Sequence, residues 1–85
     1  MNYQPYLRVR VDLKTHLDAI GVTPYQLGKW MSGVSTPMIY AVCNGTRRPS
    51  LDVIEAILNT LRRQGYATSL TDIVRVDAIE RDAEP

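Results

Sequence analysis

The sequence predicts a mainly α-helical domain with a central helix-turn-helix and a small two-stranded β-ribbon made by its N- and C-terminal segments. Three observations predict this fold class. Residues 23–45 contain two helix start signals and two glycine stops at the spacing of two short helices. Residues 51–64 carry apolar side chains at helical spacing after a serine cap. Residues 7–11 alternate between apolar and basic side chains, which is the two-residue period of a strand, and residues 73–77 are their best partner.

Length and composition bound the number of domains and the cellular compartment. The chain has 85 residues, 45% of them hydrophobic, which corresponds to a single domain. It lacks both an apolar run of the roughly 20 residues that cross a membrane and the apolar core of a signal peptide. Its one cysteine, Cys43, cannot form an internal disulfide and is expected to be a small buried hydrophobe. We expect a cytoplasmic protein, with a domain at residues 1–77 and an acidic, disordered tail at residues 78–85.

The two ends of the domain carry segments that we expect to pair. Leu7–Val11 places three apolar side chains on one face and two arginines on the other, as a half-buried strand does. A single strand is not stable alone, and Ile73–Asp77 is the best partner for it. The alternative is a long first helix over residues 7–20, because a short apolar run fits both periods. We prefer the ribbon and retain the helix as the alternative.

A helix is expected directly after the first strand. Asp12 is positioned to cap a helix over residues 13–20, whose leucines turn inward and which ends at Gly21. This helix contains the only histidine, His16, and no Cys, Asp or Glu other than Asp12 and Asp18 stands at a ligand-like spacing from it. We therefore expect His16 to be a surface or core-edge residue rather than a metal ligand.

The central segment, Thr23–Gly45, has the pattern of two short helices joined by a tight turn. Thr23 caps the first helix, and Pro24 takes its first position, where no amide donor is needed. Gly33 is suited to the positive φ of a helix stop, and Ser35 caps the second helix. The second helix has apolar positions at helical spacing and ends at an Asn-Gly pair. Two short helices around a glycine-containing turn form the helix-turn-helix pattern, whose second helix can enter the major groove of DNA.

The helix over residues 51–64 is the best marked in the chain. Ser50 caps it, Gly65 ends it, and the two arginines of its last turn complement the helix dipole. The apolar face that we expect to be buried consists of Leu51, Ile54, Ile57, Leu58 and Leu61. Residues 69–72 then fit one short helical turn before the second strand.

The charge distribution is uneven although the net charge is only +1. Residues 1–50 carry six basic and two acidic side chains, whereas residues 51–85 carry four basic and seven acidic ones. No Asp or Glu lies between Asp18 and Asp52, a stretch that includes the two central helices and the basic turn Thr46–Pro49. A polyanion can approach such a face without meeting a carboxylate, and phosphate contacts supply most sequence-independent affinity for nucleic acid.

Three pieces of sequence resemble the helix-turn-helix domains of the Cro and lambda-repressor-like superfamily of transcription regulators. They are Leu27-Gly28, Gly33-Val34-Ser35 and Asn44–Leu51, and they occur in the order of that family. Gly28 and Gly33 are one residue further apart than the family norm. The resemblance covers roughly residues 12–76 and implies a compact lambda-repressor-like bundle of about five helices. Within it, residues 35–44 would form the recognition helix.

The resemblance also implies which residues would meet DNA. Four residues would face base edges, namely Thr36, Pro37, Tyr40 and Ala41. Five would face phosphates, namely Thr23, Ser35, Asn44, Arg47 and Arg48. These assignments suit the chemistry, since Arg and Asn donate to phosphate oxygens while Ala and Thr can contact thymine methyls. The base-facing set holds no Arg, Lys, Gln or Asn, so we expect specificity to rest on DNA shape and on the flanking arginines.

We expect a small transcriptional repressor that binds double-stranded DNA as a homodimer, with two recognition helices about 34–36 Å apart on a palindromic operator. The alternative is a protein–protein interaction module of antitoxin or adaptor type, which would use an exposed Trp30-Met31 edge or the terminal strands. An enzyme is not expected, because the sequence has no glycine-rich phosphate loop and no recognisable Cys–His dyad. We expect no cofactor, no metal and no membrane partner.

Overall fold

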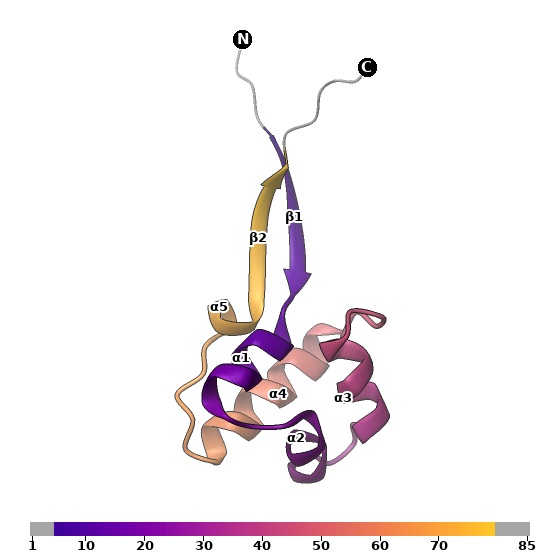
Figure 1. Ribbon diagram of the computed structural model, residues 1–85, viewed down its shortest axis with the longest axis vertical. Helices are drawn as coiled ribbons and strands as arrows, with labels where there is room; N and C mark the ends of the chain where they lie inside the picture. Colours follow the sequence, from indigo (N-terminus) through magenta and orange to yellow (C-terminus); the bar gives the residue numbers. More distant parts are fainter. Residues whose placement is uncertain (1–4, 80–85) are drawn as a thin grey trace.

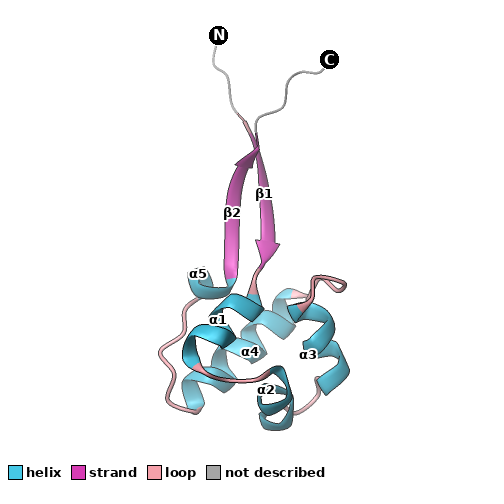
Figure 2. Ribbon diagram, in the orientation of Figure 1, coloured by secondary structure: helices cyan, strands magenta, loops and turns pink. Residues whose placement is uncertain are grey.

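The computed structural model describes residues 5–79, which form five helices and a two-stranded antiparallel sheet (Figure 1). The helices make one body, and the ribbon of two strands projects away from it (Figure 2). In chain order the elements are β1 (Tyr6–Val11), α1 (Leu13–Ile20), α2 (Pro24–Trp30), α3 (Thr36–Cys43), α4 (Leu51–Arg63), α5 (Leu70–Ile73) and β2 (Val74–Ile79). The prediction of a mainly helical fold with a ribbon of N- and C-terminal segments is confirmed.

The ribbon pairs β1 with β2 in an antiparallel register that sets Val9 opposite Val76. A first helix over residues 7–20 is therefore wrong, because the chain stays extended to Val11 and α1 begins only after its Asp12 cap. The second strand also runs further than expected. Ala78 and Ile79, assigned from the sequence to the tail, belong to β2, and the rest of that tail, residues 80–85, lies outside the described residues.

Both faces of the ribbon are exposed, whereas the alternating pattern predicted a half-buried strand. The side chains of Leu7, Val9 and Val76 are 67%, 45% and 59% exposed. Only the base of the ribbon contacts the helical core, through Val11 and Val74. The alternation is thus real, but the ribbon projects beyond the helices, so nothing in residues 5–79 covers its apolar face.

The core lies between the helices. Its buried apolar side chains are Leu13, Leu17, Val22, Leu27, Met31, Ile39, Val42, Ile54, Ile57, Leu61 and Ile73. One member of the face predicted for residues 51–64 is misplaced, because Leu51 is 81% exposed at the first position of α4, where no other element covers it. Within the described part of the chain, no helix is long and apolar enough to cross a membrane.

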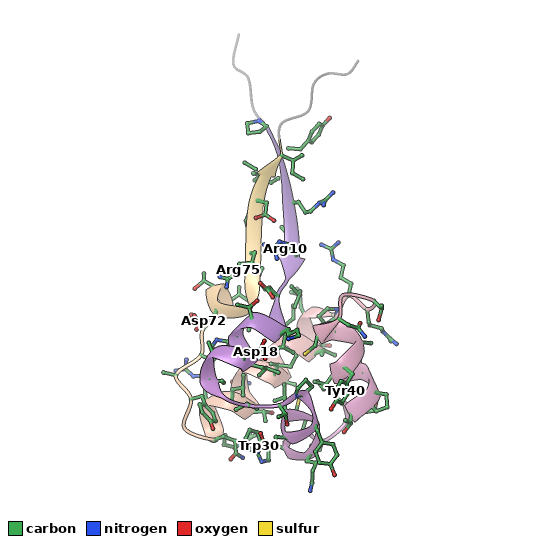
Figure 3. All side chains as sticks on the ribbon, in the orientation of Figure 1. Arg10, Asp18, Trp30, Tyr40, Asp72 and Arg75 are labelled. Carbon is green, nitrogen blue, oxygen red and sulfur yellow. The ribbon has the colours of Figure 1, made fainter. Side chains whose placement is uncertain are left out.

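Two contacts at the edge of the core show where His16 and Trp30 lie. His16 Nε2 lies 3.0 Å from the hydroxyl of Thr68, which is buried, so this histidine joins α1 to the segment before α5. The Trp30 ring, labelled in Figure 3, stacks on Tyr66 with centroids 6.4 Å apart, and Met31 is buried. The expected exposed Trp30-Met31 edge is therefore wrong, because Met31 is buried and Trp30 is half-buried against the core.

Candidate nucleic-acid interface

α2 and α3 follow one another around a short turn, and each begins with a side-chain cap. Thr23 Oγ1 accepts a hydrogen bond from Gln26 N at 3.0 Å, and Gln26 Oε1 accepts one from Thr23 N at 3.1 Å, which is a capping box. Ser35 Oγ accepts from Met38 N at 3.3 Å and opens α3. Between the helices Gly33 has a φ of +82°, the left-handed conformation that glycine adopts without strain.

The two helices meet closely at Gly28 and Thr36. A Cβ atom on Gly28 would lie 2.5 Å from Thr36 Oγ1 and 3.0 Å from Thr36 Cα. Thr36 is accordingly half-buried at the first position of α3, with its side chain against α2. Of the four residues expected at base edges, this one is turned toward the protein.

The outer side of α3 presents the other three residues expected at base edges. Pro37 is exposed and Tyr40 is 46% exposed, and the Tyr40 side chain can be followed on α3 in Figure 3. Ala41 is half-buried. The opposite side of the helix carries Ile39 and Val42, which are buried in the core. One face of α3 therefore packs into the core, and the other presents an uncharged surface to solvent.

The turn after α3 is held by its own hydrogen bonds. The carbonyl oxygen of Ala41 accepts from Thr46 N at 3.0 Å and from Arg47 N at 3.1 Å. Asn44 Oδ1 accepts from the Thr46 hydroxyl at 2.7 Å and from Thr46 N at 3.1 Å. These bonds fix the backbone from which the exposed Arg47 side chain projects. They also occupy the oxygen of the Asn44 amide and leave its nitrogen as the donor that can face a ligand.

Arg48 joins this turn to the ribbon. Its Nη2 donates to the carbonyl oxygen of Val9 at 2.9 Å, a contact between residues 39 positions apart. A groove of about 410 Å³ runs between the turn and β1, lined by Arg8, Val9, Arg10, Val11, Val42, Gly45, Arg47 and Arg48. A second hollow continues along β1 past Arg8 toward the ribbon tip. Four arginines therefore line the groove between β1 and the turn that follows α3.

These four arginines differ in how far their charge is compensated. Arg10 Nε lies 2.8 Å from an Asp77 carboxylate oxygen, and its Nη1 lies 3.6 Å from Asp12. The bond to Asp77 raises the pKa of Arg10 above its ordinary value. Among the described residues, Arg8, Arg47 and Arg48 have no carboxylate within ion-pair distance. Three of the four arginines that line the groove therefore have no carboxylate partner among the described residues.

Only the part of this groove that the basic turn supplies was predicted from the sequence. Arg47 and Arg48 were predicted from the basic turn, but Arg8 was assigned only to the wet face of a strand. Its neighbourhood depends on the tertiary contact between Arg48 and Val9. The alternation of arginines along β1 was the only signal for Arg8 in the sequence. It shows that Arg8 is on the polar face of a strand, but it does not show which other part of the fold lies near that strand.

One carboxylate comes near the far end of α3. Asp18 lines a mostly apolar pocket of about 290 Å³ together with Tyr40, Cys43 and Asn44, but it forms an ion pair of 2.9 Å with Lys14. Burial raises the pKa of the half-buried Cys43 thiol, which disfavours the reactive thiolate. No group of three or more His, Cys, Asp or Glu residues that could hold a metal ion occurs in residues 5–79.

No protein-family model, curated protein or solved structure matches the chain. Its function is therefore to be inferred from α3, the following turn and β1.

Proposed function

We propose that the protein binds duplex DNA as a small transcriptional repressor. In this proposal, α2 and α3 form a lambda-repressor-like helix-turn-helix, α3 enters the major groove, and the turn over residues 44–48 lies on the phosphate backbone. The observation that carries the proposal is the groove beside α3, in which Arg8, Arg47 and Arg48 lack carboxylate partners among the described residues.

Phosphate contact is the chemistry that this groove suits best. A guanidinium presents two parallel donors to an anionic oxygen pair, and such contacts supply most sequence-independent affinity for DNA. Arg47 is exposed on a backbone fixed by hydrogen bonds, so little conformational freedom of the turn is lost on binding. Arg8 would extend the phosphate contacts from the turn along β1. The donors of Asn44 and Ser35, and that of Thr23 after release from its capping box, would add to them.

Base contacts would come from the outer side of α3. Tyr40 and Pro37 are exposed there, and Ala41 can meet a thymine methyl group. Thr36 has a different part in this proposal, because its packing against Gly28 sets how closely α3 approaches α2. Sequence preference would then depend on few direct contacts and on DNA shape. We place the protein in the cytoplasm, where a thiol such as Cys43 stays reduced.

The test is fluorescence anisotropy of the full chain with a random-sequence duplex over a series of salt concentrations. We expect affinity to fall steeply with salt, with a slope of about 0.9 for each phosphate neutralised. Arg47→Glu and Arg8→Glu should each weaken binding to every duplex. Arg48→Glu is avoided because Arg48 also holds β1.

Arg63→Glu is the matched control. It makes the same change of charge at an exposed residue at the end of α4 that does not line the groove. Absence of binding at low salt would refute the proposal. Equal losses for Arg47→Glu and Arg63→Glu would show that overall charge, rather than this groove, attracts DNA.

The competing proposal of a protein-interaction module keeps one supporting observation, the projecting ribbon. An exposed strand edge can accept a strand from another chain. Such binding would depend little on salt, so the same titration separates it from DNA binding.

A further inference from the structure

The mostly apolar pocket of about 290 Å³ beside α3 is separate from the arginine groove, because the two share no lining residue. Its apolar walls come from three helices, through Leu17 of α1, Pro24 of α2 and Cys43 of α3. Leu17 is 1% exposed and forms the floor. Asp18 and Tyr40, both labelled in Figure 3, line the pocket from α1 and α3. Hollows between the helices of a bundle are common sites for small molecules.

The charges at the rim of this pocket compensate each other. Lys14 Nζ lies 2.9 Å from a carboxylate oxygen of Asp18, so neither charge is left to attract a ligand of opposite sign. Burial raises the pKa of the Cys43 thiol, which therefore stays uncharged at neutral pH. A charged molecule would lose water against the apolar walls without gaining a partner of opposite charge. The pocket thus favours a neutral ligand.

Two groups on the α3 side of the pocket can orient such a ligand. Asn44 Oδ1 already accepts two hydrogen bonds from Thr46, and no described residue accepts one from the Asn44 amide nitrogen. That nitrogen can therefore donate to an acceptor in the pocket. Tyr40 contributes an aromatic ring to the lining, and aromatic pairs are favourable beyond the area that they bury. A ring with one hydrogen-bond acceptor uses both groups.

The volume of the pocket limits the size of the ligand. An apolar cavity of about 150 Å³ holds one benzene ring. The volume of about 290 Å³ found here therefore corresponds to about two fused rings. It lies at the lower end of the range for small-molecule sites, which begins at about 300 Å³. A larger ligand would extend past the rim formed by Lys14 and Asp18.

We propose that this pocket binds a neutral molecule of about two fused aromatic rings with one hydrogen-bond acceptor, and that the bound molecule weakens DNA binding by occupying Tyr40 and Asn44. The acceptor takes the Asn44 N–H, and the rings lie between Leu17 and Tyr40. The effect on DNA rests on the proposed function, which gives Tyr40 to a base and Asn44 to a phosphate, whereas the ligand site does not rest on it. Because coupling between two sites is reciprocal, DNA would weaken ligand binding by the same factor.

Amide NMR spectra of the full chain without DNA, titrated with coumarin, test the site. Coumarin is a neutral two-ring lactone whose carbonyl oxygen accepts hydrogen bonds. With about eleven non-hydrogen atoms it should bind with a Kd of about 0.1–1 mM, and the saturable shifts should centre on the residues that line the pocket. The anion coumarin-3-carboxylate should bind more weakly. Absence of saturable shifts up to about 5 mM coumarin would overturn the proposal, as would shifts centred on another part of the chain or equal binding of the anion.

Two substitutions of Cys43 test whether the volume of the pocket is what binds. Cys43→Leu places a larger side chain in the pocket and should weaken coumarin binding about tenfold or more. Cys43→Ala is the matched control, because it changes the same residue but leaves the pocket open, and it should bind like the native chain. Circular dichroism checks that both variants fold. If Cys43→Leu does not fold, Tyr40→Ala replaces it and should also weaken binding, because it removes the aromatic wall. Equal binding by the native chain and the folded variant would refute the site.

The effect on DNA is tested by anisotropy with a selected operator duplex. Saturating coumarin should raise the Kd of the native chain for that duplex about fivefold or more, and it should have no such effect on Cys43→Leu. An operator affinity that coumarin leaves unchanged would refute the coupling. A chain that binds coumarin at the pocket but no duplex at low salt would refute the proposed function, and the coupling with it, while supporting the ligand site.

Discussion

Thr36 at the start of α3 packs directly on Gly28 of α2, where a Cβ atom would come within 2.5 Å of Thr36 Oγ1 and 3.0 Å of its Cα. Gly28 is the one glycine of the chain at which an added Cβ atom would meet another residue within 4 Å. The two helices can therefore pack this closely only because residue 28 has no side chain. It also explains why Thr36 is directed toward the protein although it begins the helix proposed to enter DNA.

Gly28→Ala should therefore destabilise the fold. Alanine gains about 1 kcal/mol of helix propensity over glycine, but overpacking at this contact costs about 1–3 kcal/mol, and one of the atoms met is backbone. We expect a net loss of free energy of unfolding, measured by urea denaturation. Combining Gly28→Ala with Thr36→Ala should recover part of that loss, because the nearest atom is then absent. A Gly28→Ala protein as stable as the native one would contradict the packing argument.

Arg47 and Arg48 are neighbours in sequence, but their substitution by alanine should affect stability differently. Arg48 donates to the Val9 carbonyl, so Arg48→Ala should lower the free energy of unfolding by about 0.5–1 kcal/mol and speed hydrogen exchange in β1. Arg47 has no side-chain partner among the described residues, and Arg47→Ala should leave stability unchanged. On duplex DNA each variant should reduce the salt slope by about one. Equal stability of the two variants would show that Arg48 does not hold the ribbon.

The local signals of this chain predicted its elements well. Asp12, Thr23, Ser35 and Ser50 each cap the helix that was expected to follow, because a cap depends only on a side chain and the amides two or three residues away. The terminal ribbon was also expected, from the alternating pattern of residues 7–11 and the need of a single strand for a partner. These predictions depend on short-range physics that a sequence displays directly.

What the sequence did not predict depends on contacts between distant residues. The exposure of Leu7 and Val9 follows from a ribbon that projects beyond the helices, and alternation alone does not distinguish a covered face from an open one. Arg8 lines the same groove as Arg47 and Arg48 because the turn after α3 contacts β1. That contact joins Arg48 to Val9, which are 39 positions apart in the sequence. Thr36 was expected at a base edge because the family resemblance places it there, and its packing against Gly28 turns it inward.

Two capping carboxylates make the fold sensitive to acid. Hydrogen bonding from Thr15 holds the pKa of Asp12 below its ordinary 3.8, with smaller help from Arg10 and Arg75. The backbone amide of Ser69 does the same for Asp72. A carboxyl group whose pKa is lower in the folded chain stabilises the fold fully above its unfolded pKa. That contribution is lost as pH falls through the folded value.

We therefore expect stability to decline below about pH 4. Asp12→Asn keeps an oxygen that can cap α1 but cannot titrate, so its urea midpoint should fall less between pH 5 and pH 2.5 than that of the native chain. The comparison is between slopes with pH, since the variant also loses its ion pairs with Arg10 and Arg75 at pH 5. An unchanged slope would mean that Asp12 does not couple folding to protonation.

Substitution of Tyr40 best distinguishes contacts with DNA bases from contacts with phosphates. It is 46% exposed on the outer side of α3 and has no charge with which to attract a phosphate. After selection of a preferred operator, Tyr40→Ala should lower affinity for that operator by about 1–3 kcal/mol while leaving binding to random duplexes nearly unchanged. Arg47→Ala should weaken both by the same factor. Tyr40→Phe then assigns the loss to the hydroxyl or to the ring. If Tyr40→Ala weakened both kinds of duplex equally, α3 would lie against the backbone, and specificity would have to come from DNA shape alone.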